Sequence, residues 1–177
     1  RLDNKSSGTG VIHLVSKDYL ASINVKGESI PTLWQVLELI AGRCIVNIEL
    51  KGINTVTPLI DLYPKALSQL GFNKEQLLIS SFNHHLLQHI KNHRPDLKTG
   101  ALTASLPLDY AAFASLLGAW SVNCDKGFIN QQMVQDAHQR GLKVWVYTVN
   151  DAATAKKMQQ LGVDGIFCNY PLEARSW

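Results

Sequence analysis

Strand-like and helix-like patterns of hydrophobic residues alternate along the chain from about residue 30 onward. The strand-like runs are short and apolar, and they occupy residues 44–51, 77–83, 99–104, 121–124, 143–150 and 165–170. The helix-like runs repeat apolar residues every three or four positions, and they occupy residues 32–41, 57–70, 84–93, 108–117, 130–140 and 152–161. This alternation predicts right-handed βαβ units that build a parallel sheet.

Polar or aromatic residues stand at the carboxyl end of nearly every predicted strand. They include Glu49, Asn83, Asn123, Tyr147 and Asn169. Such residues converge at the mouth of a (β/α)8 barrel, which is the face at the carboxyl ends of its strands. An open dinucleotide-binding sheet would carry a GxGxxG turn after its first strand, and the sequence has none. We therefore predict an α/β fold, a TIM-type (β/α)8 barrel with about six of its eight strands in this chain.

The strand predicted over residues 44–51 has two chemically different faces, because side chains alternate across a strand. One face holds Val46, Ile48 and Leu50, and the other holds Asn47, Glu49 and Lys51. We expect helices to cover the apolar face and the polar face to open onto a pocket inside the barrel. Residues 1–30 are turn-rich and polar, and we interpret them as a loop or insertion leading into a single barrel domain over residues 1–177.

Composition excludes several classes of protein. The 177 residues are 46% hydrophobic and 18% charged, with a formal net charge of +3, which is ordinary for a globular domain. The basic residues are scattered, so we expect no nucleic-acid partner, and no apolar run is long enough for stable membrane insertion. The three cysteines, Cys44, Cys124 and Cys168, have no zinc or disulfide spacing. We interpret them as buried free thiols in a reducing, cytoplasmic compartment.

Glu49 and Lys51 are the first candidates for chemistry. A carboxylate is a hard oxygen ligand suited to Mg2+ or Ca2+, and a lysine on the same face could hold a phosphate as a point charge. A salt bridge inside the barrel explains the same pattern. Tyr147 has a similar pair of interpretations, since it either walls a ligand pocket at the mouth or fills the barrel interior.

Three histidines, His85, His89 and His93, recur at helical spacing on one side of the segment 84–93. This spacing can build a metal site. They lie about a quarter turn from the apolar stripe of that helix, however, so we expect them to flank the buried face in contact with solvent. His84 is different, because it stands at the turn from strand to helix, near the mouth.

Five segments, in order along the chain, resemble the glycerophosphodiester phosphodiesterase family. RLDNKSSGTG resembles the family's LDRTTNGTG, IPTLWQVLELI its IPTLEEVLELL, and VNIELKG its NIELK. LLISSFNHHLLQHIKNHRPDLKTGAL resembles its SFN…LRPDLPLG region, and VWVYTVNDAATAKKMQQLGVDGIFCNYP its VWVWTVND…LGVDGIITDRP. The resemblance implies a TIM-type barrel that uses a divalent metal, Mg2+ or Ca2+, to hydrolyse small glycerophosphodiesters to glycerol 3-phosphate and an alcohol.

The resemblance also implies roles for individual residues. Glu49 matches a metal-ligand glutamate, Lys51 the lysine near the substrate phosphate, and Phe82 a residue at the mouth in the SF motif. Tyr147 stands where the family usually has tryptophan, and we expect it to bind substrate. Asn169 replaces a more common aspartate, so no metal role is carried over to it.

The family's pattern begins with segments that this sequence does not contain. These are a His-Arg-Gly strand, a Glu-x-Asp strand and a His-Asp pair, which carry the catalytic histidines and two further metal ligands. We therefore expect the histidine pair upstream of Arg1, an N-terminally incomplete barrel, and no catalysis by these 177 residues alone. Two alternatives stay open: a truncated or degenerate barrel that binds a phosphorylated ligand or partner without catalysis, and a lysophospholipase D-type phosphodiesterase. The sequence does not indicate the oligomeric state.

Overall fold

The computed structural model describes residues 1–52 and 54–177, which divide into two compact units. The first unit comprises residues 1–44 and 61–72, and the second comprises residues 45–60 and 73–177. Helix α3 (Val56–Gln69) crosses the division. Every residue proposed above for the site lies in the second unit.

The first unit holds short elements and two longer helices. Its elements are the 3-10 turn η1 (Ile12–Leu14), α1 (Lys17–Ser22), the antiparallel strands β1 (Asn24–Val25) and β2 (Glu28–Ser29), α2 (Leu33–Ile40) and the larger part of α3. Thr32 begins α2 through a capping box, in which its side chain accepts a hydrogen bond from the Gln35 amide and Gln35 reciprocates. A Cβ at Gly42 would stand 2.3 Å from the Gly71 carbonyl oxygen, so this close approach requires glycine.

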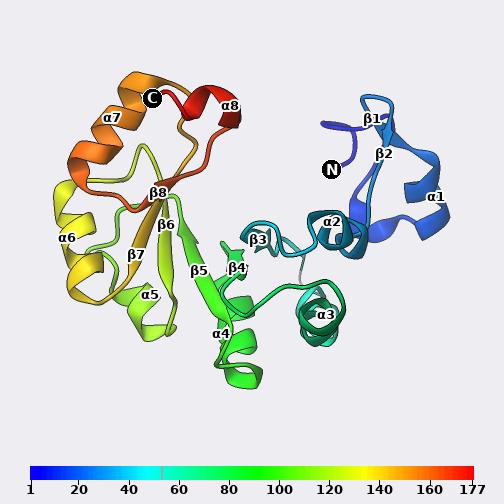
Figure 1. The fold of residues 1–177 in the computed structure, drawn as a ribbon, viewed down its shortest axis with the longest axis horizontal. Helices are drawn as coiled ribbons and strands as arrows, with labels where there is room; N and C mark the ends of the chain where they lie inside the picture. Colours follow the sequence, from blue (N-terminus) through cyan, green and yellow to red (C-terminus); the bar gives the residue numbers. More distant parts are fainter. Residues whose placement is uncertain (53) are drawn as a thin grey trace. The chain divides into compact units, whose positions relative to one another are not determined.

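The second unit is a six-stranded parallel sheet in the order β3-β4-β5-β6-β7-β8 (Figure 1). The strands are β3 (Val46–Glu49), β4 (Leu77–Ser81), β5 (Lys98–Thr103), β6 (Ser121–Asp125), β7 (Lys143–Tyr147) and β8 (Gly165–Ile166). The helices that follow β4 to β8 are α4 (His84–His93), α5 (Ala112–Leu116), α6 (Gln131–Gln139), α7 (Ala152–Leu161) and α8 (Pro171–Ala174). The six predicted strands and their sequential parallel order are confirmed.

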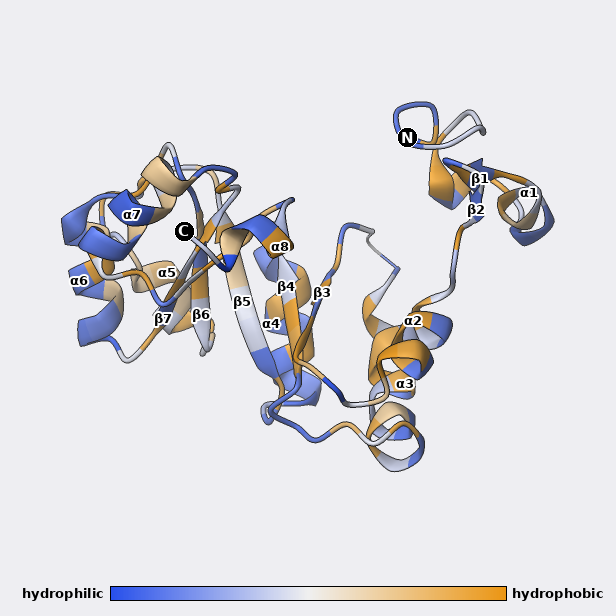
Figure 2. Ribbon diagram, turned by 45° about the horizontal axis from the view of Figure 1, so that its top comes forward, coloured by the Kyte–Doolittle hydropathy of each residue, from blue (hydrophilic) through white to orange (hydrophobic). Residues whose placement is uncertain are grey.

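The outer face of the sheet is apolar and covered by helices. Val122, Cys124, Val144 and Val146 are buried there in one core cluster with residues from α4 to α7 such as Met133. In Figure 2, α6 and α7 are largely blue, which agrees with helices that turn one apolar stripe to the sheet and the rest to solvent.

The opposite face of the sheet is polar and curled. Glu49, Ser80, Gly100 and Ser121 are successive register partners on this face. The alternation predicted for residues 44–51 is present from Ile48 to Lys51, where Ile48 and Leu50 are buried and Glu49 and Lys51 are exposed. At Gly100, a Cβ would approach the Asn123 Nδ2 atom to 2.7 Å, because side chains from neighbouring strands fill the concave side.

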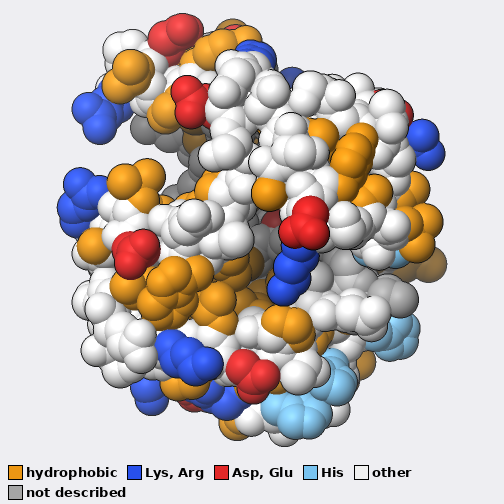
Figure 3. Space-filling model, turned by 90° about the vertical axis from the view of Figure 1, so that its right-hand side faces the viewer, with side chains coloured by type: hydrophobic (Ala, Val, Ile, Leu, Met, Phe, Trp, Pro, Cys, Tyr) orange, Lys and Arg blue, Asp and Glu red, His pale blue; other side chains and the backbone are white. Residues whose placement is uncertain are grey.

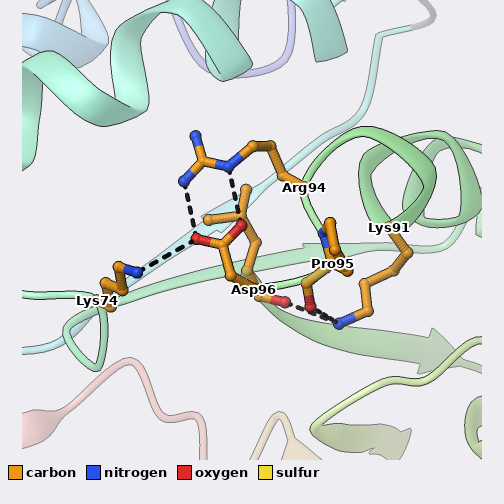
Figure 4. Close-up of polar contacts among 6 residues, drawn as sticks. Lys74, Lys91, Arg94, Pro95 and Asp96 are labelled. Carbon is orange, nitrogen blue, oxygen red and sulfur yellow. Dashed lines mark hydrogen bonds and ion pairs between the residues drawn. The ribbon is translucent and has the colours of Figure 1, made fainter.

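Charged residues fix the turn from α4 into β5, at the amino end of the strand (Figure 4). The Arg94 guanidinium donates two hydrogen bonds of 2.9 Å to the carboxylate of Asp96, and Lys74 lies 3.8 Å from it. The Lys91 Nζ atom donates to the carbonyl oxygen of Pro95 at 2.8 Å. The Arg94 hydrogen bonds lower the pKa of Asp96 to about 2.

Some details differ from the expectations. The helix expected over residues 108–117 covers only Ala112–Leu116, because a hydrogen-bonded turn precedes it. Residues 1–30 contain α1 and a small hairpin in addition to loops. The expectation of three buried thiols is wrong for two of them, because Cys44 is exposed and Cys168 is only partly buried. Cys124 is buried, and burial raises its pKa to about 12. Among the described residues, no helix is long and apolar enough to cross a membrane.

Candidate active site

Glu49 and Lys51 form an ion pair at the carboxyl end of β3. The Lys51 Nζ atom lies 3.4 Å from the Glu49 Oε2 atom. The side chain of Glu49 is 31% exposed and that of Lys51 is 78% exposed. A pair this accessible contributes about 0–1 kcal/mol to stability, so both groups stay available to a ligand.

Phe82 and Tyr147 form the second pair, across the concave side of the sheet. Phe82 directly follows β4 and Tyr147 ends β7, yet their ring centroids are 5.8 Å apart in an edge-on arrangement. The Tyr147 hydroxyl donates a 2.8 Å hydrogen bond to the carbonyl oxygen of Thr103 at the end of β5. The two aromatic residues are therefore held at the strand ends by the curl of the sheet.

The charge environment of Tyr147 connects it to the carboxylates at the strand ends. Burial raises the pKa of Tyr147 to about 12, and the charges of Asp125, Cys124 and Glu49 act in the same direction. Glu49 and Asp125 therefore lie close enough to act on the same phenol.

Asp125 is a further candidate for the site, which our sequence analysis did not identify. It ends β6, where it is the register partner of Tyr147. The predicted strand stopped one residue earlier, at Cys124, so the acidic residue was left in the following loop. The period-two alternation contained the signal, because Asn123 and Asp125 share a face opposite the buried Cys124.

Most of the histidines of the chain lie on α4. Exposed histidine side chains gather on the lower part of the face in Figure 3, and α4 carries four of the six in the chain. His85, His89 and His93 are exposed as expected, and the His89 and His93 rings stack 4.5 Å apart. His84 bonds the Leu102 carbonyl oxygen through Nε2 at 2.9 Å and stacks on the Phe113 ring.

The fit of the site to a divalent metal is partial. Within the described part of the chain, no three His, Cys, Asp or Glu residues are grouped to hold a metal ion. Glu49 offers one carboxylate at the mouth, which suits Mg2+ because that ion keeps several waters and uses one or two carboxylates. The described residues thus supply one ligand and not a complete metal site.

Comparison with known proteins identifies the family. The model of the glycerophosphoryl diester phosphodiesterase family matches residues 12–173. The chain belongs to this family. A glycerophosphodiester phosphodiesterase of Caldanaerobacter subterraneus subsp. tengcongensis is 34% identical to it over 147 residues, which are 82% of this chain and 60% of that protein. A glycerophosphodiester phosphodiesterase of Bacillus altitudinis is 29% identical over 147 residues, 81% of this chain and 60% of that protein. The chain thus spans about 60% of the length of these two relatives.

Solved structures of phosphodiesterases share the fold. An Oleispira antarctica phosphodiesterase in complex with the product sn-glycerol-3-phosphate superposes with a TM-score of 0.86 at 26% identity, covering 99% of this chain and 75% of that one. A glycerophosphodiester phosphodiesterase of Parabacteroides distasonis gives a TM-score of 0.78 at 22% identity, covering 93% of this chain and 71% of that one. The predicted fold class is confirmed: the second unit is a curled, parallel, six-stranded part of a TIM-type barrel.

Proposed function

We propose that the protein of which these residues are part hydrolyses glycerophosphodiesters to glycerol 3-phosphate and an alcohol with a divalent metal. The observation that carries the proposal is the accessible Glu49–Lys51 pair at the carboxyl end of β3, in a chain that belongs to this family. TIM-barrel enzymes bind their substrates at this end of the strands. The product complex of the Oleispira antarctica relative supports a small phosphorylated ligand.

Each site residue has a distinct proposed role. Glu49 contributes a carboxylate to a Mg2+ or Ca2+ ion, which when bound would neutralise charge on a phosphoryl oxygen. Lys51 holds a phosphate oxygen with its exposed ammonium, and the 3.4 Å contact keeps that ammonium oriented next to Glu49. Phe82 and Tyr147 form an aromatic wall that positions the organic part of the substrate.

A second function is favoured by the placement of the histidines. Among the described residues, none of the histidines on α4 forms an ion pair or a hydrogen bond with Glu49 or Lys51. A phosphate-binding site without a general acid and base can bind a phosphorylated ligand and leave it intact. Binding without hydrolysis is therefore the alternative.

Product binding and turnover, measured side by side, test both functions. 31P NMR of glycerol 3-phosphate with the 177-residue chain reports binding. Release of glycerol 3-phosphate from glycerophosphoglycerol by the complete protein reports hydrolysis, and both are measured with Mg2+, Ca2+ or EDTA. Metal-dependent turnover that Glu49→Gln abolishes supports the hydrolase. Binding that Lys51→Met weakens, without turnover, supports the alternative. If neither binding nor turnover is observed, both proposed functions are overturned.

A further inference from the structure

We propose that His89 and His93 on α4 form a chelating site for a divalent cation that prefers imidazole ligands, such as Zn2+ or Cu2+. The inference does not depend on the proposed function, because it uses other residues and another class of metal ion. Its basis is the contact between two exposed imidazole rings and a backbone hydrogen bond that orients one of them.

The two histidines lie one helical turn apart on the exposed side of α4. Residues at positions i and i+4 are neighbours on a helix surface. The ring centroids of His89 and His93 are 4.5 Å apart, at an interplanar angle of 22°. Two imidazole nitrogens bound to one Zn2+ ion lie about 3 Å apart, because each Zn–N bond is about 2.0–2.1 Å long. Small rotations of the exposed rings toward each other therefore bring both within reach of one ion.

The backbone selects the tautomer of His93 that a metal ion requires. The Nδ1 atom of His93 lies 2.9 Å from the carbonyl oxygen of His89. Since a carbonyl oxygen only accepts, Nδ1 carries the proton, and in the neutral ring the Nε2 atom keeps its lone pair. Histidines that bind metal ions commonly donate their other ring nitrogen to a backbone carbonyl, which orients the ring and makes it a better ligand. His93 thus has the arrangement of a metal ligand.

The surroundings of the pair also favour a cation. In residues 1–52 and 54–177, the ring nitrogens of His89 form no hydrogen bond and no ion pair. Lys91 lies on the opposite side of the helix, since two residues span about 200°, and its ammonium donates to the carbonyl oxygens of Pro95 and Leu97. His93 is the last residue of α4, where the partial negative charge of the helix C-terminus favours a cation.

The two imidazoles specify the class of ion. Imidazole suits Zn2+, Cu2+ and Ni2+, whereas Mg2+ and Ca2+ prefer oxygen ligands. The described residues contain no group of three His, Cys, Asp or Glu that could hold a metal ion, so water would complete the coordination shell. His85 continues the spacing toward the start of α4, but among the described residues it makes no ring contact with His89. The geometry therefore favours His89 with His93 over His85 with His89.

Zn2+ titrations of the complete protein test the inference, with Mg2+ in excess so that sites for hard cations stay occupied. We expect calorimetry to show Zn2+ binding that His89→Gln and His93→Gln each weaken about tenfold or more. His85→Gln, at an exposed histidine on the same helix, is the matched control and should bind Zn2+ normally. All three side chains are exposed, so the variants should melt at the same temperature without Zn2+. Equal weakening by His85→Gln, or no weakening by His89→Gln or His93→Gln, would overturn the inference.

NMR of the wild-type protein identifies the ligand atoms without any substitution. Long-range 1H–15N spectra should show that Zn2+ shifts the Nε2 resonance of His93 most, because its Nδ1 atom is protonated and hydrogen-bonded. Cu2+ should bind more tightly than Zn2+, as the order of first-row ions requires, and should broaden the signals of His89 and His93 before those of His85. Coordination through Nδ1 of His93, or earlier broadening of His85, would overturn the inference.

Discussion

The rings of Phe82 and Tyr147 meet edge-on at 5.8 Å, although the strands that they follow or end, β4 and β7, are separated by β5 and β6. Three strand spacings in a flat sheet would put them about 14 Å apart. The contact therefore requires a sheet that curls toward closure, and it lies at the end of the strands where TIM-type barrels bind their substrates. One contact thus connects the curvature of the fold to the proposed substrate site.

Tyr147→Phe removes the hydroxyl that donates to the Thr103 carbonyl oxygen and keeps the ring contact with Phe82. We expect the free energy of unfolding to fall by about 1 kcal/mol, because the carbonyl loses its hydrogen bond. The melting temperature should fall by roughly 2–4 °C. Thermal unfolding followed by circular dichroism at neutral pH measures the change.

The same variant has a pH signature. The pKa of Tyr147 is raised from the ordinary tyrosine value to about 12. The contribution of Tyr147 to the free energy of unfolding is therefore fully present below about pH 10. It is lost as pH rises toward 12, because the folded state then holds a proton that the unfolded state has released. The stability difference between wild type and Tyr147→Phe should shrink over that range, and a difference that grows would contradict the assignment.

Lys51→Met separates stability from ligand binding. The Lys51 side chain is 78% exposed, so losing the pair with Glu49 should change the free energy of unfolding by less than about 1 kcal/mol. Binding of glycerol 3-phosphate should weaken about tenfold or more, because a charged partner of the phosphate is removed. Isothermal titration calorimetry measures the affinity, and Lys157→Met, an exposed lysine on α7, is the control that should bind normally. Equal weakening in both variants would indicate general electrostatic attraction.

Sequence alternation predicts the strands well because each strand buries one apolar face under a helix. The predicted start of β4, at Leu77, agrees with the structure, and α4 and α7 have the predicted bounds. Glu49 and Lys51 could be selected because charge on an otherwise apolar strand is conspicuous. Contacts between distant strands could not be predicted, since the Phe82–Tyr147 pair depends on how tightly the sheet curls.

Asp125 shows a second limit on what the sequence alone can predict about the site. Its importance comes from what surrounds it, a register partner at Tyr147 and the lack of a nearby cation among the described residues, and neither is a property of the local sequence. A one-residue error at a strand end was enough to move it from the concave face into a loop.

Gly100→Ala tests the packing of the concave face. The added Cβ would stand 2.7 Å from Asn123 Nδ2 and 2.9 Å from Ser121 Oγ, both buried and joined by the 2.9 Å hydrogen bond from Ser121 Oγ to Asn123 Oδ1. We expect a loss of about 1–3 kcal/mol, because neither side chain can move without breaking that bond. Gly165→Ala is the matched control on β8, where the nearest side-chain atoms are at an ordinary 3.7 Å. Urea unfolding measures the free energy of unfolding of both variants. Equal losses in Gly100→Ala and Gly165→Ala would contradict the steric argument.

Asp96→Asn tests the ion-pair cluster at the start of β5 (Figure 4). The Arg94 hydrogen bonds hold the pKa of Asp96 at about 2, below its ordinary value of 3.8. A lowered folded-state pKa contributes stability above pH 3.8 that is lost as pH falls through 2. The carboxylate is 35% exposed, so we expect a loss of a few tenths to about 1 kcal/mol at pH 7.

The difference in the free energy of unfolding between wild type and Asp96→Asn should therefore be constant from pH 7 to about 5. It should narrow as pH falls from about 4 toward 2. Urea unfolding at a series of pH values measures it. Lys74→Met, which removes the more distant cation at 3.8 Å and leaves the Arg94 bonds, should cost less than Asp96→Asn at every pH. A difference that stays constant down to pH 2.5 would mean that the Arg94 bonds do not depend on the charge of Asp96.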